Sequence, residues 1–356
     1  MSSKVTDRKV YSSIVRNISQ DIEKLSKKIY KRIFDKLPHL NSQYSNTDKR
    51  RSYEDIQYHL NYLSHSIHYT QEALFNEYIR WTKSLLLSRN LSRKSLVITF
   101  ESMKEILEEK FPTEKKIVNL YLDNAISIIK DEKRRDFSYI NDTNDHKEVA
   151  LKYLDYVLNG KKREADTLIR NLISQDIDIK DIYIDIFQPV QQEIGRLWET
   201  NQINVAQEHY STAVTQLIIS RLYDKIFSSE KIGNTLIATC IGGELHELGI
   251  RMIADFFEME GWDTYYLGAN TPIDSIISSI INNNADLLAV SATIMIHVST
   301  VEEMIIQIRK TEAKNVKIMV GGYPFNIVPN LWEIIGADAF ATDAQSAIKT
   351  ASKLLR

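Results

Sequence analysis

Two patterns of hydrophobic positions follow each other along the chain. Up to about residue 227, apolar residues recur at intervals of three and four, which is the period of an amphipathic helix. One such series is Ile56, Leu60, Leu63 and Ile67. From Thr235 onward, short apolar runs alternate with segments long enough for a helix and its loops, at 235–241, 264–267, 287–291, 317–320 and 339–341. The sequence therefore predicts helices first and then a parallel sheet covered on both faces.

Several residues mark where the predicted helices begin and end. Pro38 and Pro112 follow helical stretches and predict helix ends, because proline cannot continue a helix. Gly160 predicts a further helix end. Asn204, with Gln207 three residues later, resembles a capping box and predicts a helix that begins directly after Asn204.

Two polar stretches divide the chain into three predicted domains. The charged stretch 131–148 and the short stretch 228–234 have the composition of linkers. We therefore expect a multidomain protein with an N-terminal all-α sensor or interaction domain at 1–135 and a four-helix bundle at 147–228. At 233–356 we expect an α/β domain, and its five strands favour a doubly wound, flavodoxin-like (Rossmann-like) sheet.

Composition narrows the cellular setting. Of 356 residues, 43% are hydrophobic and 26% are charged, and the net charge of −2 gives no general reason for nucleic-acid binding. The chain has a single cysteine, Cys240, which fits a reducing compartment. The sequence has neither the apolar core of a signal peptide at its start nor an uncharged stretch of membrane-spanning length. We expect a soluble cytoplasmic protein without membrane or direct nucleic-acid partners.

Candidate ligand-binding residues follow three of the predicted strands. They are the segment 242–249, which contains His246, the segment 291–293 and the glycine pair 321–322. Each has a simpler explanation by itself: a surface histidine, a cap and a turn. Because ligands of doubly wound sheets bind at the carboxyl ends of the strands, their joint occurrence there predicts one binding site.

The same segments resemble the cobalamin-binding domain of methionine synthases, mutases and light-sensing regulators, over about 235–356. The family pattern is an acidic residue, any residue, His, two residues and Gly, then Ser-x-Thr or Ser-x-Leu, then Gly-Gly. The resemblance implies a corrinoid with His246 as lower axial cobalt ligand. It also implies that Glu244 accepts the other ring N–H, where most members carry Asp. The segment 265–272 (YYLGANTP) matches the light-sensing branch.

The resemblance implies a set of cofactor contacts in this domain. The glycines leave room for the displaced nucleotide tail of cobalamin, since they have no Cβ. Ser291 and Thr293 can hydrogen-bond its polar atoms. The implied contact residues are Glu244, Leu245, His246, Glu247, Leu248, Gly249, Ser291, Thr293, Gly321 and Gly322.

A second group of candidate residues precedes the sheet. Trp198 is followed, after nine residues, by Glu208 and His209. In isolation this is a core tryptophan and a solvated Glu-His pair. In context it resembles the helical cap of the CarH/LitR-type cobalamin photoreceptors. That resemblance implies adenosylcobalamin, with Trp198 against the deoxyadenosyl group and Glu208 hydrogen-bonded near it. It also implies His209 as a second, upper cobalt ligand after light breaks the Co–C bond.

The N-terminal third lacks a recognisable MerR-type DNA-binding domain. Its segment 58–96 resembles the N-terminal helical domains of standalone cobalamin sensors, including the photocobilin group, which also bind biliverdin. That resemblance implies a tetrapyrrole pocket, with Arg80 or Arg89 pairing a propionate. The same residues also suit the core and surface of a plain helical bundle. The candidate pocket residues are His59, His65, His68, Tyr69 and Trp81.

Three functions fit these observations. The leading prediction is a cobalamin-dependent photoreceptor, not an enzyme, in which photolysis drives a conformational or oligomeric switch in a homo-oligomer with an unidentified downstream protein partner. The first alternative is a corrinoid protein that shuttles methyl groups for a methyltransferase. The second is a non-photic cobalamin or stress sensor that docks partner proteins. Trp198 and His209 favour the photoreceptor over the methyl shuttle, which needs an open upper face.

Overall fold

The computed structural model describes residues 2–132 and 137–356. The chain divides into two compact units, Met1–Arg134 and Arg135–Arg356, and each is described by itself. Part of the predicted linker 131–148 lies outside the described residues, and the part at 137–146 contains no helix. The division of the second unit into domains at 147–228 and 233–356 stays a prediction.

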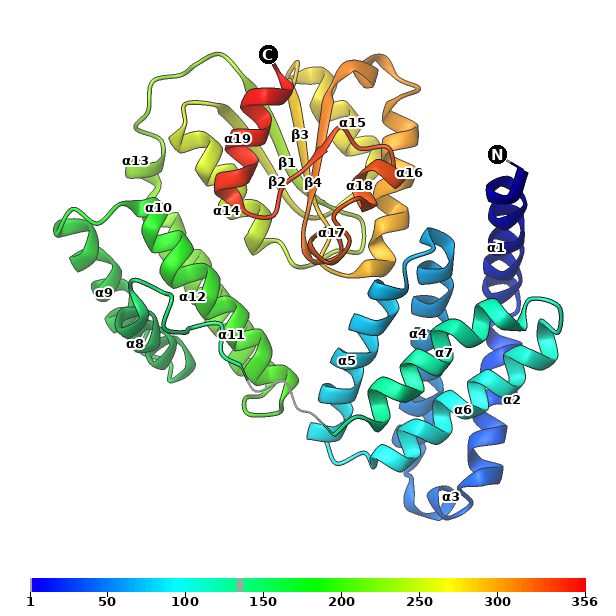
Figure 1. Ribbon diagram of the computed structural model, residues 1–356. Helices are drawn as coiled ribbons and strands as arrows, with labels where there is room; N and C mark the ends of the chain where they lie inside the picture. The colour runs from blue at the N-terminus through cyan, green and yellow to red at the C-terminus, as the bar shows by residue number, and fades with distance from the viewer. Residues whose placement is uncertain (1, 133–136) are drawn as a thin grey trace. The chain divides into compact units, whose positions relative to one another are not determined.

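The first unit is helical, as predicted (Figure 1). Its helices enclose a continuous apolar core. The helix that carries Ile56, Leu60, Leu63 and Ile67 buries all four side chains. Pro38 and Pro112 follow the ends of two helices, as predicted. The helices are α1 (Ser2–Gln20), α2 (Ile22–Lys36), α3 (His39–Gln43), α4 (Asn46–Tyr69), α5 (Glu72–Ser88), α6 (Arg93–Lys110) and α7 (Lys115–Lys130).

The second unit begins with a helical bundle. A capping box between Asn204 and Gln207 starts α12, as predicted, and Gly160 has a left-handed φ of 74° just beyond the end of α8. The elements are α8 (Lys147–Leu158), α9 (Lys162–Ser174), α10 (Ile179–Asp181), a π-helical turn (Ile182–Phe187), α11 (Gln188–Glu199), α12 (Val205–Ser220) and α13 (Tyr223–Ile226).

Pro189 explains the π-helical turn. The sequence pattern alone did not predict this turn. Proline has no N–H, so the carbonyl of Asp185, four residues earlier, loses its regular helical donor. The side-chain amide Nδ2 of Asn144 donates to that carbonyl instead, at 2.6 Å. The substitution of a side-chain donor for a backbone donor lets the helix continue through the proline.

The rest of the second unit is a five-stranded parallel sheet in the order β2-β1-β3-β4-β5. This is the flavodoxin-like order that the sequence predicts. Helices α14 and α19 pack on one face, and Figure 1 shows α15 and α16 on the other. The strands are β1 (Thr235–Ile241), β2 (Asp263–Thr271), β3 (Leu287–Ser291), β4 (Lys317–Gly321) and β5 (Ala339–Phe340). The helices are α14 (Leu248–Met259), α15 (Ile273–Asn282), α16 (Val298–Ile308), α17 (Tyr323–Ile327), α18 (Leu331–Ile334) and α19 (Ala344–Leu354), with 3₁₀ turns at Met295–His297 and Glu312–Asn315.

The bundle packs against α14 of the sheet through a shared apolar cluster that includes Met252 and Phe256. Polar contacts join the same elements. The hydroxyl of Tyr183 donates to Asp255 Oδ2 at 2.8 Å, and Gln216 Nε2 donates to Glu247 Oε1 at 3.0 Å. The loop that follows β1 is therefore tied to the bundle through Glu247.

Asp255 gives this contact a pH dependence. Burial raises the pKa of Asp255 to about 6, and the bond from Tyr183 only partly offsets this. The folded protein therefore binds an extra proton between about pH 4 and 6, so the free energy of unfolding falls as pH rises through that window. We expect Asp255→Asn, whose amide oxygen still accepts from Tyr183, to lose the part of this fall that Asp255 causes and to be more stable at pH 7 by up to about 3 kcal/mol.

Urea unfolding of both proteins at pH 4, 5, 6 and 7 measures this difference. Burial also raises the pKa of Asp55, in the first unit, to about 6, so the wild-type curve by itself does not assign the effect. If the free energy of unfolding depends on pH equally in wild type and in Asp255→Asn, the pKa of Asp255 is not raised in the folded protein.

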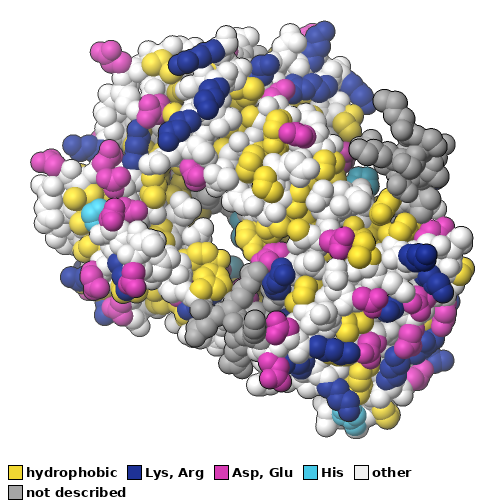
Figure 2. All heavy atoms as spheres, in the orientation of Figure 1, with side chains coloured by type: hydrophobic (Ala, Val, Ile, Leu, Met, Phe, Trp, Pro, Cys, Tyr) yellow, Lys and Arg dark blue, Asp and Glu magenta, His cyan; other side chains and the backbone are white. Residues whose placement is uncertain are grey.

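Charged side chains of both signs lie interspersed on the face of the molecule in Figure 2. This arrangement matches the net charge of −2. Among the helices of the described residues, none has both the length and the apolar character needed to cross a membrane.

Candidate functional site

The loop after β1 is held by the end of β2. Gly243 takes a positive φ of 86°, and its N–H donates to the side-chain oxygen of Asn270 at 2.8 Å. The N–H of Asn270 in turn donates to the carbonyl of Glu244 at 3.0 Å. Asn270 was not among the predicted site residues, although it lies within the segment 265–272 that matched the family. Its reciprocal bonds fix the loop that carries His246.

Glu244 and His246 are brought together in this loop. The Glu244 carboxylate is fully buried, and its Oε1 accepts from the backbone N–H of His246 at 3.0 Å and from the ring Nδ1 at 2.5 Å. Nδ1 therefore carries the proton, which leaves Nε2 as the nitrogen that can bind a metal. The His246 side chain is 58% exposed, so that nitrogen is accessible.

Hydrogen bonds fix the charge of this pair. Burial by itself would raise the pKa of Glu244, but bonds from His246, His297 and backbone N–H groups outweigh burial and lower it well below its usual range. The bond to Glu244 raises the pKa of His246, against the opposing effect of burial. Glu244 is therefore ionised at neutral pH and holds the imidazole in one orientation.

A second imidazole on the same carboxylate was missed by sequence reasoning. His297, in the 3₁₀ turn Met295–His297, places its Nδ1 3.0 Å from Glu244 Oε2. The backbone N–H groups of Thr293 and Ile294 donate to the same oxygen at 2.8 and 3.1 Å. His297 lies 53 residues beyond Glu244, and the family pattern gave no signal for it.

The glycines differ in what surrounds them. A Cβ on Gly249, in the first turn of α14, would meet no atom within 4 Å, and the residue is exposed, so no protein atom blocks a ligand at this position. A Cβ on Gly321 would lie 3.3 Å from the carbonyl oxygen of Ala341. Gly322 has φ 104°, and its Cβ would lie 2.1 Å from the carbonyl oxygen of Ala292. Gly322 is therefore required by the backbone itself, whatever binds there.

The remaining predicted contacts in the sheet occupy varied positions. Ser291 ends β3, and both Ser291 and Thr293 are half-buried. Leu245 is exposed beside His246. Glu247 accepts from Ala269 N–H at 3.0 Å as well as from the bundle, and Leu248 packs against the bundle's apolar cluster.

The bundle brings Glu208 close to this loop. The negative charge of Glu208 contributes to the raised pKa of His246, after the larger effect of Glu244. His209 pairs through Nδ1 with the Glu208 carboxylate and is 75% exposed. Trp198 is half-buried in the last turn of α11.

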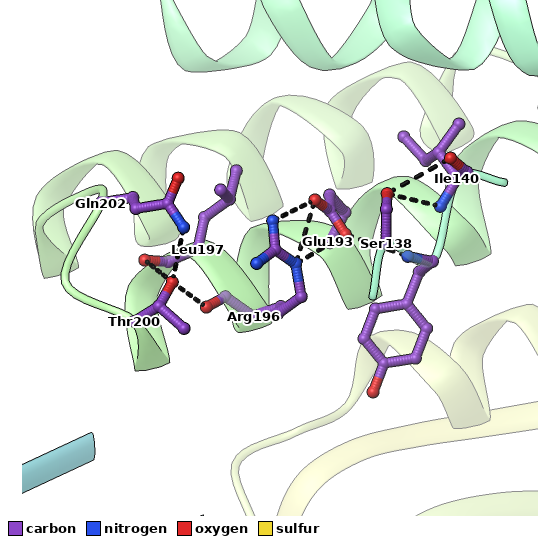
Figure 3. Close-up of polar contacts among 8 residues, drawn as sticks. Ser138, Ile140, Glu193, Arg196, Leu197, Thr200 and Gln202 are labelled. Atoms are coloured by element: carbon purple, nitrogen blue, oxygen red, sulfur yellow. Dashed lines mark hydrogen bonds and ion pairs between the residues drawn. The ribbon is translucent and has the colours of Figure 1, made fainter. Parts of the chain in front are cut away.

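A polar cluster stabilises the turn that carries Trp198. The Arg196 guanidinium donates to both carboxylate oxygens of buried Glu193, with its shortest bond at 2.6 Å (Figure 3). The hydroxyl of Thr200 donates to the carbonyl of Arg196 at 2.8 Å. Glu193 also accepts from the N–H of Tyr139 at 3.0 Å, which attaches the segment before the bundle to α11.

The predicted tetrapyrrole residues of the first unit are occupied by packing and local bonds. His59 is buried, its Nδ1 lies 2.7 Å from the Tyr78 hydroxyl, and burial lowers its pKa to about 3. Tyr69 is buried, His68 packs on Tyr69, and Trp81 is partly exposed beside Tyr78. Arg80 pairs with Glu77 at 3.3 Å, and Arg89 donates to a carbonyl of its own helix at 3.0 Å. His65 lies in α4, as do His59, His68 and Tyr69.

The donor set suits a metal that brings most of its own ligands. Within the described ranges, no three His, Cys, Asp or Glu side chains form a group that could hold a metal ion. A cobalt held in a corrin ring needs only an axial ligand from the protein. An accessible imidazole fixed by a carboxylate, next to open space at Gly249, fits that requirement.

Comparison with protein families agrees with this geometry. A model described as B12 binding domain matches residues 234–351, and a second model of the same description matches residues 149–223. The chain carries B12-binding domains. The first match covers the sheet, and the second covers most of the bundle.

The relatives of these B12-binding domains are corrinoid proteins. Dimethylamine corrinoid protein 1 of Methanosarcina acetivorans is 28% identical over 215 residues, 59% of this chain and 99% of the relative. The dimethylamine corrinoid protein of Methanosarcina barkeri is 29% identical over 131 residues, 36% of this chain and 59% of that protein. The solved monomethylamine corrinoid protein of Methanosarcina barkeri has the same fold, with a TM-score of 0.52, 20% identity, and coverage of 59% of this chain and 99% of that one.

These relatives overturn the leading prediction from the sequence. They are corrinoid proteins named for methylamines, so the photoreceptor interpretation is wrong, and the alternative of a methyl-shuttling corrinoid protein is better supported. The error came from three side chains, Trp198, Glu208 and His209. A half-buried tryptophan and a mutually paired Glu-His do not specify which group the cobalt carries.

A third model, described as Phycobilisome protein, matches residues 2–160. This match runs across the division between the two units and includes α8 of the bundle. It therefore does not correspond to one unit of the fold. Neither light sensing nor biliverdin gains support from it.

Proposed function

We propose that this chain is a corrinoid-binding methyl carrier that works with a methyltransferase and is not itself an enzyme. The observation that carries the proposal is the Glu244–His246 pair at the carboxyl end of β1, inside a region that is similar to dimethylamine corrinoid protein 1 of Methanosarcina acetivorans over 99% of that protein. The bound corrinoid would supply a cobalt that accepts a methyl group and gives it up.

The residues of the sheet would bind and orient that group. His246 would offer Nε2 to the metal, while Glu244 keeps the proton on Nδ1. Gly249 and Gly321 would leave room for the nucleotide tail, and Ser291 and Thr293 would hydrogen-bond it. Gly322, Leu245, Glu247 and Leu248 shape the loops around it.

The helical bundle would cover the side of the bound corrinoid that faces away from the sheet. Glu208 already lies close enough to affect the pKa of His246, and its partner His209 is accessible to a ligand or to solvent. Trp198 sits in the neighbouring helix end, where its ring would limit water access. For a methyl carrier, this cover has to move aside when the methyltransferase docks.

A spectroscopic experiment tests the proposed activity. The apoprotein is loaded with hydroxocobalamin, separated by gel filtration, reduced, and given a methyl donor with and without a corrinoid methyltransferase. We expect a stable methylated corrinoid that is demethylated only with the methyltransferase and its acceptor. A corrinoid that resists methylation, with or without the methyltransferase, would contradict the carrier function.

Three finer points stay predictions. The first is that adenosylcobalamin is the bound form. Loading the apoprotein with adenosylcobalamin and with methylcobalamin in parallel compares its affinities for the two cofactors. A homo-oligomeric state is the second, measured by light scattering of the loaded protein. The third is biliverdin in the first unit, for which absence of a red-shifted absorbance after mixing would count against binding.

A further inference from the structure

The Glu244 carboxylate has two sides with different neighbours. Its Oε1 accepts from His246, through the backbone N–H and the ring Nδ1. Its Oε2 accepts from three groups of the loop after β3: the N–H groups of Thr293 and Ile294 and the ring Nδ1 of His297. One carboxylate therefore connects the predicted ligand loop to the neighbouring strand.

The geometry points to His297 as a positioning residue for His246. We infer that the bond from His297 to Oε2 fixes the rotation of the Glu244 carboxylate, and that this rotation aims Oε1 at Nδ1 of His246. The inference rests on the proposed function, since it assigns His246 to the cobalt.

The length of the glutamate side chain explains why an additional anchor is needed. Glu has one more rotatable bond than Asp, which most members of the cobalamin-binding family carry at this position. Without a constraint on that bond, the buried carboxylate could rotate and leave the imidazole without its acceptor. The two backbone N–H groups approach from adjacent residues of one loop, whereas His297 contributes a side-chain donor from the following 3₁₀ turn.

The surroundings of His297 suit a fixed support rather than a metal ligand. Its side chain is only 13% exposed, compared with 58% for His246. Its Nε2 lies 3.4 Å from the position a Cβ would take on Gly243, so the ring packs against the same loop that carries Glu244. A Cβ at 243 would be in ordinary van der Waals contact with this ring.

Two substitutions at His297 separate the hydrogen bond from the packing. His297→Ala removes the donor to Oε2. His297→Asn keeps a donor, because the asparagine Nδ2 can take a position similar to that of the histidine Nδ1. Both full-length variants are loaded with cob(II)alamin, and electron paramagnetic resonance measures the ratio of histidine-bound to unbound cobalt.

We expect His297→Ala to lower that ratio about tenfold, the effect of losing one hydrogen bond to a charged group, and His297→Asn to restore it to near the wild-type value. An unchanged ratio in His297→Ala, or a ratio in His297→Asn as low as in His297→Ala, would overturn the inference. If His297→Ala retains no corrinoid, His297→Asn decides: histidine-bound cobalt supports the role, and unbound cobalt contradicts it. Failure of the assignment of His246 to cobalt is distinguishable, because wild-type protein would then show no histidine-bound cobalt. Failure of the carrier function would instead appear as a corrinoid that resists methylation in the experiment above.

Discussion

Replacing His246 with alanine should lower the affinity for cobalamin by at least about 100-fold. Loss of a partner that merely orients a metal ligand lowers metal affinity about 10- to 100-fold. Loss of the ligand itself should lower the affinity further. Any corrinoid that remains bound should lack a protein nitrogen on cobalt. Equilibrium dialysis with hydroxocobalamin measures the affinity, and the absorption spectrum reports the axial ligand.

His146 is the matched control for this substitution. It belongs to the same unit and lies directly before α8, outside the predicted site. His146→Ala should leave cobalamin affinity within about twofold of wild type, and circular dichroism of both variants checks the fold. Retention of wild-type affinity by His246→Ala would remove the basis for the proposed site.

Replacement of Gly322, directly after β4, should strongly destabilise the second unit. Its φ of 104° and ψ of 178° lie in a region that only glycine adopts readily, and a Cβ would overlap the Ala292 carbonyl. We expect Gly322→Ala to lower the free energy of unfolding of the second unit by more than about 3 kcal/mol, a large part of the stability of an ordinary domain. Urea unfolding followed by circular dichroism measures this.

Another glycine of the same unit provides a control for that prediction. Gly233 also has a positive φ, 84°, but a Cβ there meets nothing within 4 Å, so Gly233→Ala should cost only about 1–2 kcal/mol. Similar losses in Gly233→Ala and Gly322→Ala would show that the contact with Ala292 relaxes.

The substitution Gly249→Ala tests cobalamin binding separately from folding. A Cβ there meets open space within a helix, so Gly249→Ala should keep or raise stability by up to about 1 kcal/mol. If the nucleotide tail fills that space, the same substitution should weaken cobalamin binding about tenfold, as overpacking of a filled space does. Dialysis with hydroxocobalamin gives the result, and unchanged affinity would place the tail elsewhere.

Much of the fold follows from local sequence patterns. The alternation of apolar runs with helix-length segments predicts the five strands and the parallel sheet, because buried strands need apolar residues on both faces. The capping box at Asn204 predicts the start of α12, since its side chain bonds to groups only three residues away. Local interactions of this kind are visible in a sequence.

Other parts of the site depend on contacts between distant segments. His297 lies 53 residues from Glu244 in the sequence and hydrogen-bonds to its carboxylate. Asn144 lies 41 residues from Asp185 and donates to the carbonyl that Pro189 leaves without a backbone donor. Neither pairing leaves a periodic signal. The functional error had a different cause, because the spacing of Trp198, Glu208 and His209 predicts a cap over the cofactor but does not indicate which chemistry the cofactor performs.

Electron paramagnetic resonance tests directly whether an imidazole nitrogen of this chain binds cobalt. The protein is labelled with nitrogen-15 at histidine and loaded with unlabelled cob(II)alamin. We expect a doublet splitting from the labelled His246 nitrogen, absent in His246→Ala. A triplet from the unlabelled benzimidazole of the cofactor, or failure of the protein to retain any corrinoid, would contradict it.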